Sequence, residues 1–128
     1  MFYPVPKTLQ TITAVAVSTN GTAYIPVPKE DAESNAITKV RALFYLDQSG
    51  GSSSPTSKLK IQTSVDAVYW ADVVESSTLT TTDSLCEESP EIAIGPYVRS
   101  ALVLSGGVAP TCTGYVCLIC TAPLDLVS

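Results

Sequence analysis

Residues 39–47, Lys-Val-Arg-Ala-Leu-Phe-Tyr-Leu-Asp, decide the fold class because their apolar side chains recur at every second position. Successive side chains of a β-strand point to opposite faces, so a period of two predicts a strand with one buried face. The charged residues of the stretch all fall on the other face. The buried set is wholly apolar and consists of Val40, Ala42, Phe44 and Leu46.

A second stretch with the same period follows a Gly/Ser-rich loop at 48–55. Lys58, Lys60, Gln62 and Ser64 alternate with Leu59, Ile61, Thr63 and Val65, which predicts a strand with the second set facing inward. The segment 69–74, which holds the single tryptophan, is expected to be its hairpin partner.

Further strands are expected on either side of this pair. Residues 11–17 alternate, and Asn20-Gly21 is typical of a hairpin turn because both residues tolerate positive φ. The return segment 23–28 has prolines two apart, which predicts a sheet edge. Residues 97–104 and 115–121 read as strands, 105–110 as a loop, and the Ser/Thr- and acid-rich segment 76–90 as a long surface excursion.

Seven or eight short strands separated by turns predict an all-β protein, a single-domain antiparallel β-sandwich of jelly-roll or immunoglobulin-like type. A chain of 128 residues matches one domain. We expect the sandwich to span 9–121, between an extended N-terminal arm (1–8) and a C-terminal tail (122–128).

Composition excludes several functions. The chain has no histidine, which removes Ser-His-Asp triads, Cys-His dyads and His-ligated metals, and we expect no enzyme activity and no cofactor. A net charge of −5 with scattered basic residues argues against nucleic-acid binding. The start of the chain does not resemble a secretory leader, and no apolar run is long enough to cross a bilayer.

The two ends of the chain and the proline-bearing edge are the predicted partner-binding elements. The arm is apolar and carries two prolines, which favour an extended form that reaches a neighbouring subunit. The apolar C-terminal tail suits the same role. The residues expected to bind a partner are Phe2, Tyr3, Val5, Tyr24, Val27, Leu124 and Leu126.

Four cysteines leave the choice between disulfides, a metal site and buried thiols open. Cys117 and Cys120 are three apart in a predicted strand, so they point to opposite faces and are expected to be small core residues rather than zinc ligands. Cys86 and Cys112 are expected in polar loops. There they are candidates for a disulfide with each other or with a neighbouring subunit.

Two other groups of residues have a functional and a structural interpretation. Trp70 with Tyr69 suggests a sugar-binding platform, but neighbours in a strand face opposite ways, and a buried core tryptophan is the favoured interpretation. The acidic residues Asp83, Glu87, Glu88 and Glu91 suggest a calcium loop, but their spacing matches no known loop, and a solvated surface is favoured.

The segment Leu59 to Val73 resembles a recurrent β-hairpin of tailed-bacteriophage virion proteins, in which a strand ends in Gln-x-Ser and a tryptophan opens the return strand. Gly95 to Leu102, with its Pro-Tyr-x-Arg sequence, resembles the strand that accompanies this hairpin. The likeness covers roughly residues 58 to 121. The turn departs from the pattern, because Val65-Asp66-Ala67 stands where Asn-Asp-Gly is usual.

This resemblance implies a non-enzymatic virion protein, a capsid decoration (cement) protein on the capsid exterior that is present in the host cytoplasm during assembly. The implied partners are the major capsid protein or other virion proteins, and further copies of the chain in a homo-oligomer. The alternatives are a collar, tail or fibre module, or a carbohydrate- or receptor-binding domain.

Overall fold

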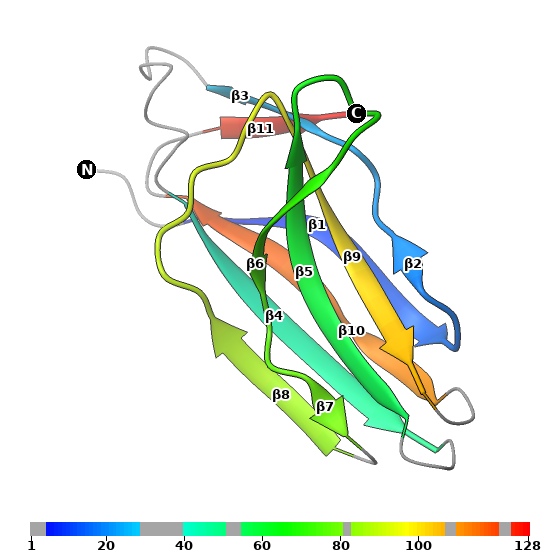
Figure 1. Cartoon of the computed structure of the whole chain (residues 1–128). Coiled ribbons are helices and arrows are strands. Elements are labelled where there is room, and N and C mark those ends of the chain that lie inside the picture. Colours follow the sequence, from blue (N-terminus) through cyan, green and yellow to red (C-terminus); the bar gives the residue numbers. More distant parts are fainter. Residues whose placement is uncertain (1–4, 29–39, 51–54, 81–82, 107–109, 121–123) are drawn as a thin grey trace.

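The computed structural model describes residues 5–28, 40–50, 55–80, 83–106, 110–120 and 124–128. In these residues the chain forms eleven β-strands in antiparallel sheets and no helix (Figure 1). The predicted all-β class and single-domain sandwich are confirmed. No helix with the length and apolar character needed to span a membrane occurs in the described residues.

The first sheet contains four strands in the order β1-β10-β4-β8. Its central strand β4 buries Ala42, Phe44 and Leu46 and confirms the alternation from which the fold was predicted. The strand predicted to begin at residue 115 begins earlier, and its Gly114 lies so close to the Tyr45 carbonyl that a Cβ atom there would overlap it. The bounds are β1 (Val5–Val15), β10 (Thr111–Cys120), β4 (Val40–Ser49) and β8 (Asp83–Glu88).

The second sheet has the order β2-β9-β5-β6, and β7 also pairs with β5. The predicted hairpin of β5 and β6 is confirmed. The predicted faces hold as far as Ile61, where the pairing with β6 shifts register, and they are wrong beyond it. Gln62 and Ser64 are buried although they were expected to face outward, and Thr63 is only half-buried. Val65 is 80% exposed because β5 ends at Ser64 and Val65 opens the turn. The bounds are β2 (Thr19–Asn20), β9 (Tyr97–Ser105), β5 (Thr56–Ser64), β6 (Ala71–Glu75) and β7 (Leu79–Thr80).

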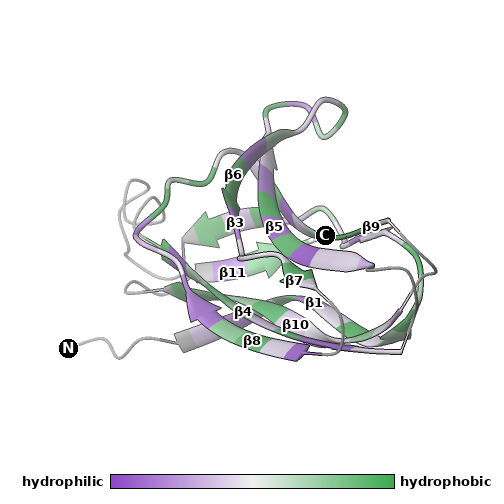
Figure 2. Ribbon diagram, turned by 60° about the horizontal axis from the view of Figure 1, so that its bottom comes forward, coloured by the Kyte–Doolittle hydropathy of each residue, from purple (hydrophilic) through white to green (hydrophobic). Residues whose placement is uncertain are grey.

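The core lies between these two sheets, which form two layers in Figure 2. It is closed by two buried hydrogen bonds that cross from sheet to sheet. Ser57 on β5 donates to Gln48 on β4, and Ser100 on β9 donates to Gln10 on β1 at 2.6 Å. The largest apolar contributions come from Phe44, Leu46, Val116 and Leu118 on one side and Leu59, Ile61, Val98 and Leu102 on the other.

The expected hairpin turn at Asn20-Gly21 is wrong. β1 ends at Val15, and the chain then crosses to the second sheet, where Thr19 pairs with Leu102. The Gly21 N–H continues this pairing by donating to the Ser100 carbonyl at 2.7 Å. Packing between the sheets therefore overrides the local turn signal, because the Gln10 amide holds the Thr19 carbonyl at 3.3 Å.

The predicted excursion over 76–90 is also wrong in part, since it contains β7 and β8. β8 pairs with β4 on one side and is the last strand of the first sheet. An edge strand tolerates many polar side chains because one of its edges faces solvent, which hides its pattern in the sequence.

Both predicted tails contribute strands. Residues 5–8 of the expected arm belong to β1, where Val5 pairs with Cys120. β1 lies at the sheet edge, so Pro6 costs the ladder little. In the expected tail, β11 (Leu124–Val127) pairs with β3 (Ile25–Pro28) in a two-stranded sheet, which confirms the edge position of the prolines.

Candidate interaction surface

The two-stranded β3–β11 ribbon exposes large apolar side chains on one face. Ile25 pairs with Val127, and Val27 lies next along β3 on the same face. Ile25 and Val27 are each 40% exposed and Val127 is 47% exposed. We call these three residues the ribbon face. The alternate positions point inward, so that Pro26 is buried and Leu126 packs against the core.

The ribbon is attached to the body at both of its strands. Before β3, the Tyr24 backbone pairs with Val98 through hydrogen bonds of 2.8 and 2.9 Å. On β11, Asp125 lies 3.9 Å from the Lys7 ammonium near the start of β1. The ribbon therefore sits at the end of the sandwich from which β1 starts (Figure 1).

The predicted partner-binding residues that the structure describes lie at this end, and those whose side chains it describes differ in exposure. Val27 is exposed on the ribbon face, whereas Tyr24 and Leu126 are half-buried and pack against the core. Val5 and Leu124 lie in strands β1 and β11. Phe2 and Tyr3 lie outside the described residues.

Ile25 and Val127 were missed from the sequence. The spacing of Ile25 and Val27 across a single proline indicates a shared face in any extended segment. Val127 had no such signal, because only the long-range pairing of β3 with β11 places it beside Ile25.

The turn between β5 and β6 is a second exposed apolar element. Val65 and Tyr69 are each 80% exposed, and Val68 is 68% exposed. Figure 2 shows this turn protruding beyond the two layers of the sandwich. We call residues 65–69 the tip.

Hydrogen bonds from two side chains hold the tip in one shape. The Ser64 hydroxyl accepts the N–H groups of Asp66 (3.2 Å) and Ala67 (2.9 Å) and donates to the Asp66 carboxylate (2.9 Å). That carboxylate also accepts the N–H groups of Val68 (2.9 Å) and Tyr69 (3.0 Å). Donation by Tyr69, Val68 and Ser64 lowers the pKa of Asp66. Ala67 takes a left-handed conformation with φ of 61°.

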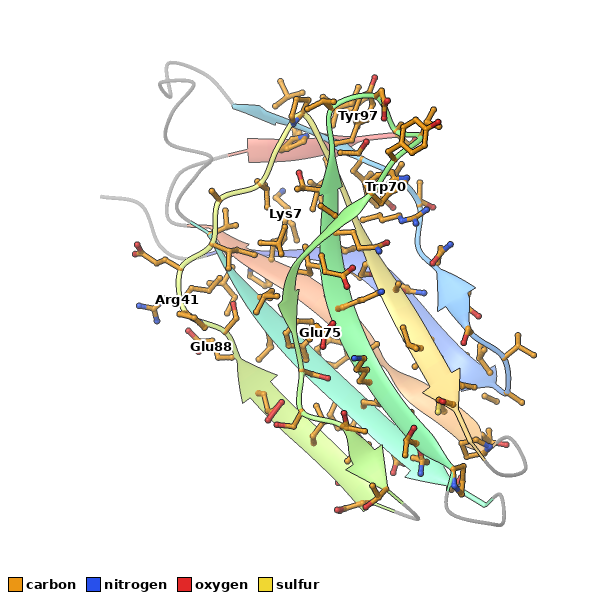
Figure 3. All side chains as sticks on the ribbon, viewed as in Figure 1. Lys7, Arg41, Trp70, Glu75, Glu88 and Tyr97 are labelled. Carbon is orange, nitrogen blue, oxygen red and sulfur yellow. The ribbon has the colours of Figure 1, made fainter. Side chains whose placement is uncertain are left out.

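Trp70 follows the tip and is half-buried, so the expectation of a core tryptophan is wrong. The Arg99 guanidinium lies 4.3 Å from the centre of its ring, a cation–π contact, and burial lowers the pKa of Arg99. Arg99 also donates to Gln62 at 2.8 Å, and Gln62 donates to Asp72 at 2.9 Å. One ring face of Trp70 is therefore taken by Arg99, at the same end of the fold as Tyr97 (Figure 3).

Cys86 and Cys112 both lie in strands rather than in the expected loops, and both are free thiols. Cys86 is opposite Tyr45 and Cys112 is opposite Gln48 on the two sides of β4. Positions 45 and 48 of a strand face opposite ways, so the thiols lie on opposite faces of the first sheet and do not bond to each other. Cys86 is exposed, whereas Cys112 is buried and burial raises its pKa. Cys117 is buried as expected, and the side chain of Cys120 lies outside the described part.

The acidic residues of 83–91 do not converge. Glu87 accepts hydrogen bonds from Ser77, and Glu88 pairs with Arg41 at 2.9 Å. The contact with Glu88 raises the pKa of Arg41. Within the described ranges, no group of three or more Cys, Asp or Glu side chains is arranged to hold a metal ion.

Comparison of the chain with protein-family models, with curated proteins and with solved structures gives no match.

Proposed function

We propose that this chain is a non-enzymatic structural protein of a bacteriophage virion, a capsid decoration protein that binds the major capsid shell and stabilises it. The observation that carries the proposal is the ribbon face, where three β-branched side chains are exposed at one end of the sandwich. Contiguous apolar surface of this kind is typical of protein interfaces. The hairpin and the Pro-Tyr-x-Arg strand that resemble virion proteins supply the biological setting.

The mechanism is adhesive. A sandwich placed across a joint between shell subunits buries the ribbon face against its neighbours, at about 25 cal/mol for each Å² of apolar surface before the cost of association. One such contact is weak. Many copies on one shell act together through multivalency.

The first experiment is light scattering of the purified protein with and without reductant, followed by cosedimentation with capsids of tailed phages. We expect a closed oligomer that pellets with shells, and the reductant arm tests whether the exposed Cys86 bonds between subunits. The variant Val27→Ser/Val127→Ser should lose shell binding. Val17→Ser is the matched control, because Val17 is 66% exposed and lies outside the ribbon.

Three outcomes would redirect the assignment. Binding to tails or fibres in place of shells would favour the collar, tail or fibre alternative. A monomer that ignores phage particles and binds a glycan would favour the recognition-domain alternative. Shell binding that survives in Val27→Ser/Val127→Ser would remove the ribbon face from the contact.

A further inference from the structure

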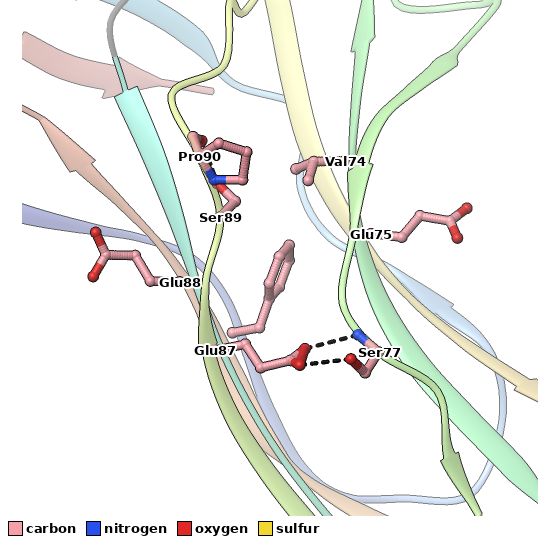
Figure 4. Close-up of a pocket in the computed structure, with 8 residues that line it drawn as sticks. Val74, Glu75, Ser77, Glu87, Glu88, Ser89 and Pro90 are labelled. Atoms are coloured by element: carbon pink, nitrogen blue, oxygen red, sulfur yellow. Dashed lines mark hydrogen bonds between the residues drawn. The ribbon is translucent and has the colours of Figure 1, made fainter.

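A recess lies between the edge strands β6 and β8, on the side of the sandwich away from β1. Its volume is about 410 Å³. Val74 of β6 and Pro90 after β8 supply its apolar surface above the buried ring of Phe44 (1% exposed), and Ser77, Glu87 and Ser89 supply polar atoms (Figure 4).

Three glutamates line the recess, and only the side chain of Glu87 points into it. Glu87 reaches across from β8 and accepts hydrogen bonds from the Ser77 N–H (2.7 Å) and hydroxyl (2.6 Å). Glu75 and Glu88 point away from it in Figure 4, and each pairs with a cation at 2.9 Å, Lys58 and Arg41 respectively. A ligand of the recess therefore needs an apolar body and a hydrogen-bond donor at its end.

The tip of the molecule supplies both an apolar body and a hydrogen-bond donor. Tyr69 presents an aromatic ring with a hydroxyl donor and is 80% exposed, and Val68 lies beside it at 68%. The Ser64 and Asp66 hydrogen bonds fix the backbone of the turn before any contact, so little backbone entropy is lost on binding. Tyrosine is among the residues most enriched at the centres of interfaces.

We propose that the tip of one copy inserts into the recess of a second copy, with Tyr69 packed against Val74 and Pro90 and its hydroxyl donating to Glu87. This contact lies outside the ribbon face. The proposal rests on the proposed structural function, and it identifies the surface through which copies of the chain bind each other.

The contact forms between molecules rather than within one. Tyr69 precedes β6, and Val74 lies five positions further along the chain, with β6 paired to β5 between Ala71 and Val74. The extended strand separates the tip from its own recess by roughly 16 Å. Because tip and recess are different surfaces, their union is heterologous and leads to a ring or an open chain of copies.

Charges around the recess are compatible with the contact. Lys58 and Arg41 neutralise the two other glutamates that line the recess. Glu87 is the third, and in the proposed contact it accepts the Tyr69 hydroxyl and does not face the Asp66 carboxylate. The chain as a whole carries a net charge of −5, so copies repel at most other surfaces and an apolar contact is favoured where it is available.

The test uses one variant on each side. Val68→Ser/Tyr69→Ser removes the apolar tip but keeps the N–H groups that Asp66 binds. Ser77→Phe fills the recess with a ring and keeps the N–H that donates to Glu87. The matched controls are Val17→Ser, an exposed valine elsewhere, and Thr78→Phe, an exposed neighbour that does not line the recess.

Sedimentation velocity over a range of concentrations gives the readout, with circular dichroism to show that each variant is folded. We expect the native chain and both controls to associate as concentration rises, and each test variant to stay monomeric. An equimolar mixture of the two variants should form a dimer and nothing larger, because it keeps one intact tip and one intact recess.

Each other outcome overturns the proposal. A native chain that is monomeric at every concentration, a test variant that associates like the native chain, or a mixture that stays monomeric would each exclude tip-in-recess assembly. Val27→Ser/Val127→Ser should keep this self-association. Failure of shell binding with self-association intact would therefore count against the proposed function alone.

Discussion

Ser76 and Ser89 make the same three hydrogen bonds on opposite sheets. The Ser76 N–H donates to the Leu59 carbonyl (2.8 Å), its hydroxyl accepts the Leu59 N–H (3.0 Å) and donates to the carbonyl of the next residue (2.9 Å). The Ser89 N–H donates to the Ala42 carbonyl, and its hydroxyl accepts the Ala42 N–H and donates to the Pro90 carbonyl, each at 2.8 Å. Each serine directly follows an edge strand, β6 or β8. Its hydroxyl accepts a backbone N–H of the neighbouring strand, β5 or β4, at the point where the edge strand ends.

Replacement of either serine by alanine is expected to destabilise the fold. Ser76→Ala and Ser89→Ala each leave a buried backbone N–H without its acceptor, which costs about 1–3 kcal/mol. Urea unfolding of each variant measures the loss. Ser84→Ala, on the exposed side of β8, is the control and should change stability by less than about 0.5 kcal/mol. Equal stability of all three variants would contradict a role for the two hydroxyls.

The Asp66 turn predicts a pH-dependent contribution to stability. Its folded pKa is lowered by the Tyr69, Val68 and Ser64 donors, whereas an unfolded aspartate titrates near about 3.9. The contribution is therefore complete above about pH 4 and is lost as the pH falls through the lower folded pKa.

Asp66→Asn is the matched variant, because its amide oxygen can accept the same hydrogen bonds but does not titrate. The stability of the native chain relative to this variant should fall as the pH is lowered from about 5 to about 2. Chemical unfolding at a series of pH values measures it. A difference that is constant with pH would show that the Asp66 charge does not interact with the turn.

Ala67 is expected to be a site where glycine stabilises the fold. Its φ of 61° is a left-handed conformation that costs an L-residue roughly 1–2 kcal/mol, and glycine avoids this cost but loses more entropy on folding. The balance favours Ala67→Gly by roughly 0.5–1 kcal/mol. Ala93→Gly, at an exposed alanine without positive φ, should destabilise instead. Thermal unfolding compares the two, and a loss of stability in both variants would contradict strain at position 67.

Arg99 is expected to shield the single tryptophan. Arg99→Ala removes the guanidinium that lies 4.3 Å from the ring centre of Trp70. Fluorescence should shift to longer wavelength and acrylamide quenching should increase, with a loss of about 0.5–1 kcal/mol of stability. Arg41→Ala removes another arginine, paired with Glu88, and should leave the emission unchanged. An unchanged quenching constant in Arg99→Ala would exclude the shielding.

Local pattern was enough for the strands that supply the core. Apolar and more polar side chains alternate along β4 because it lies inside its sheet, with one face on the core and the other face more exposed. β5 shows the same alternation as far as Ile61, and the β5–β6 hairpin was predicted because its two strands are close in sequence. The absence of histidine likewise needed no structure to exclude the chemistries that require it.

Edge and terminal elements were harder to predict. β8 was taken for a surface excursion because its polar side chains are tolerated at an edge. Asn20-Gly21 has the composition of a hairpin turn, yet the Gly21 N–H donates to the Ser100 carbonyl and so continues the pairing with the second sheet, while the Gln10 amide donates to the Thr19 carbonyl. The strands in the expected tails were missed because their partners lie far away in the chain, as with Val5 and Cys120.

The sequence by itself determined the fold class, the two alternating central strands and the apolar character of the chain ends, because each depends on side chains within one short segment. Only the tertiary structure decided which apolar residues stay exposed. Ile25 and Val127 meet on the ribbon face, and Leu126 turns inward, through a strand pairing that spans most of the chain. The recess likewise combines β4, β6 and β8, and no local pattern specifies distances between segments that only folding brings together.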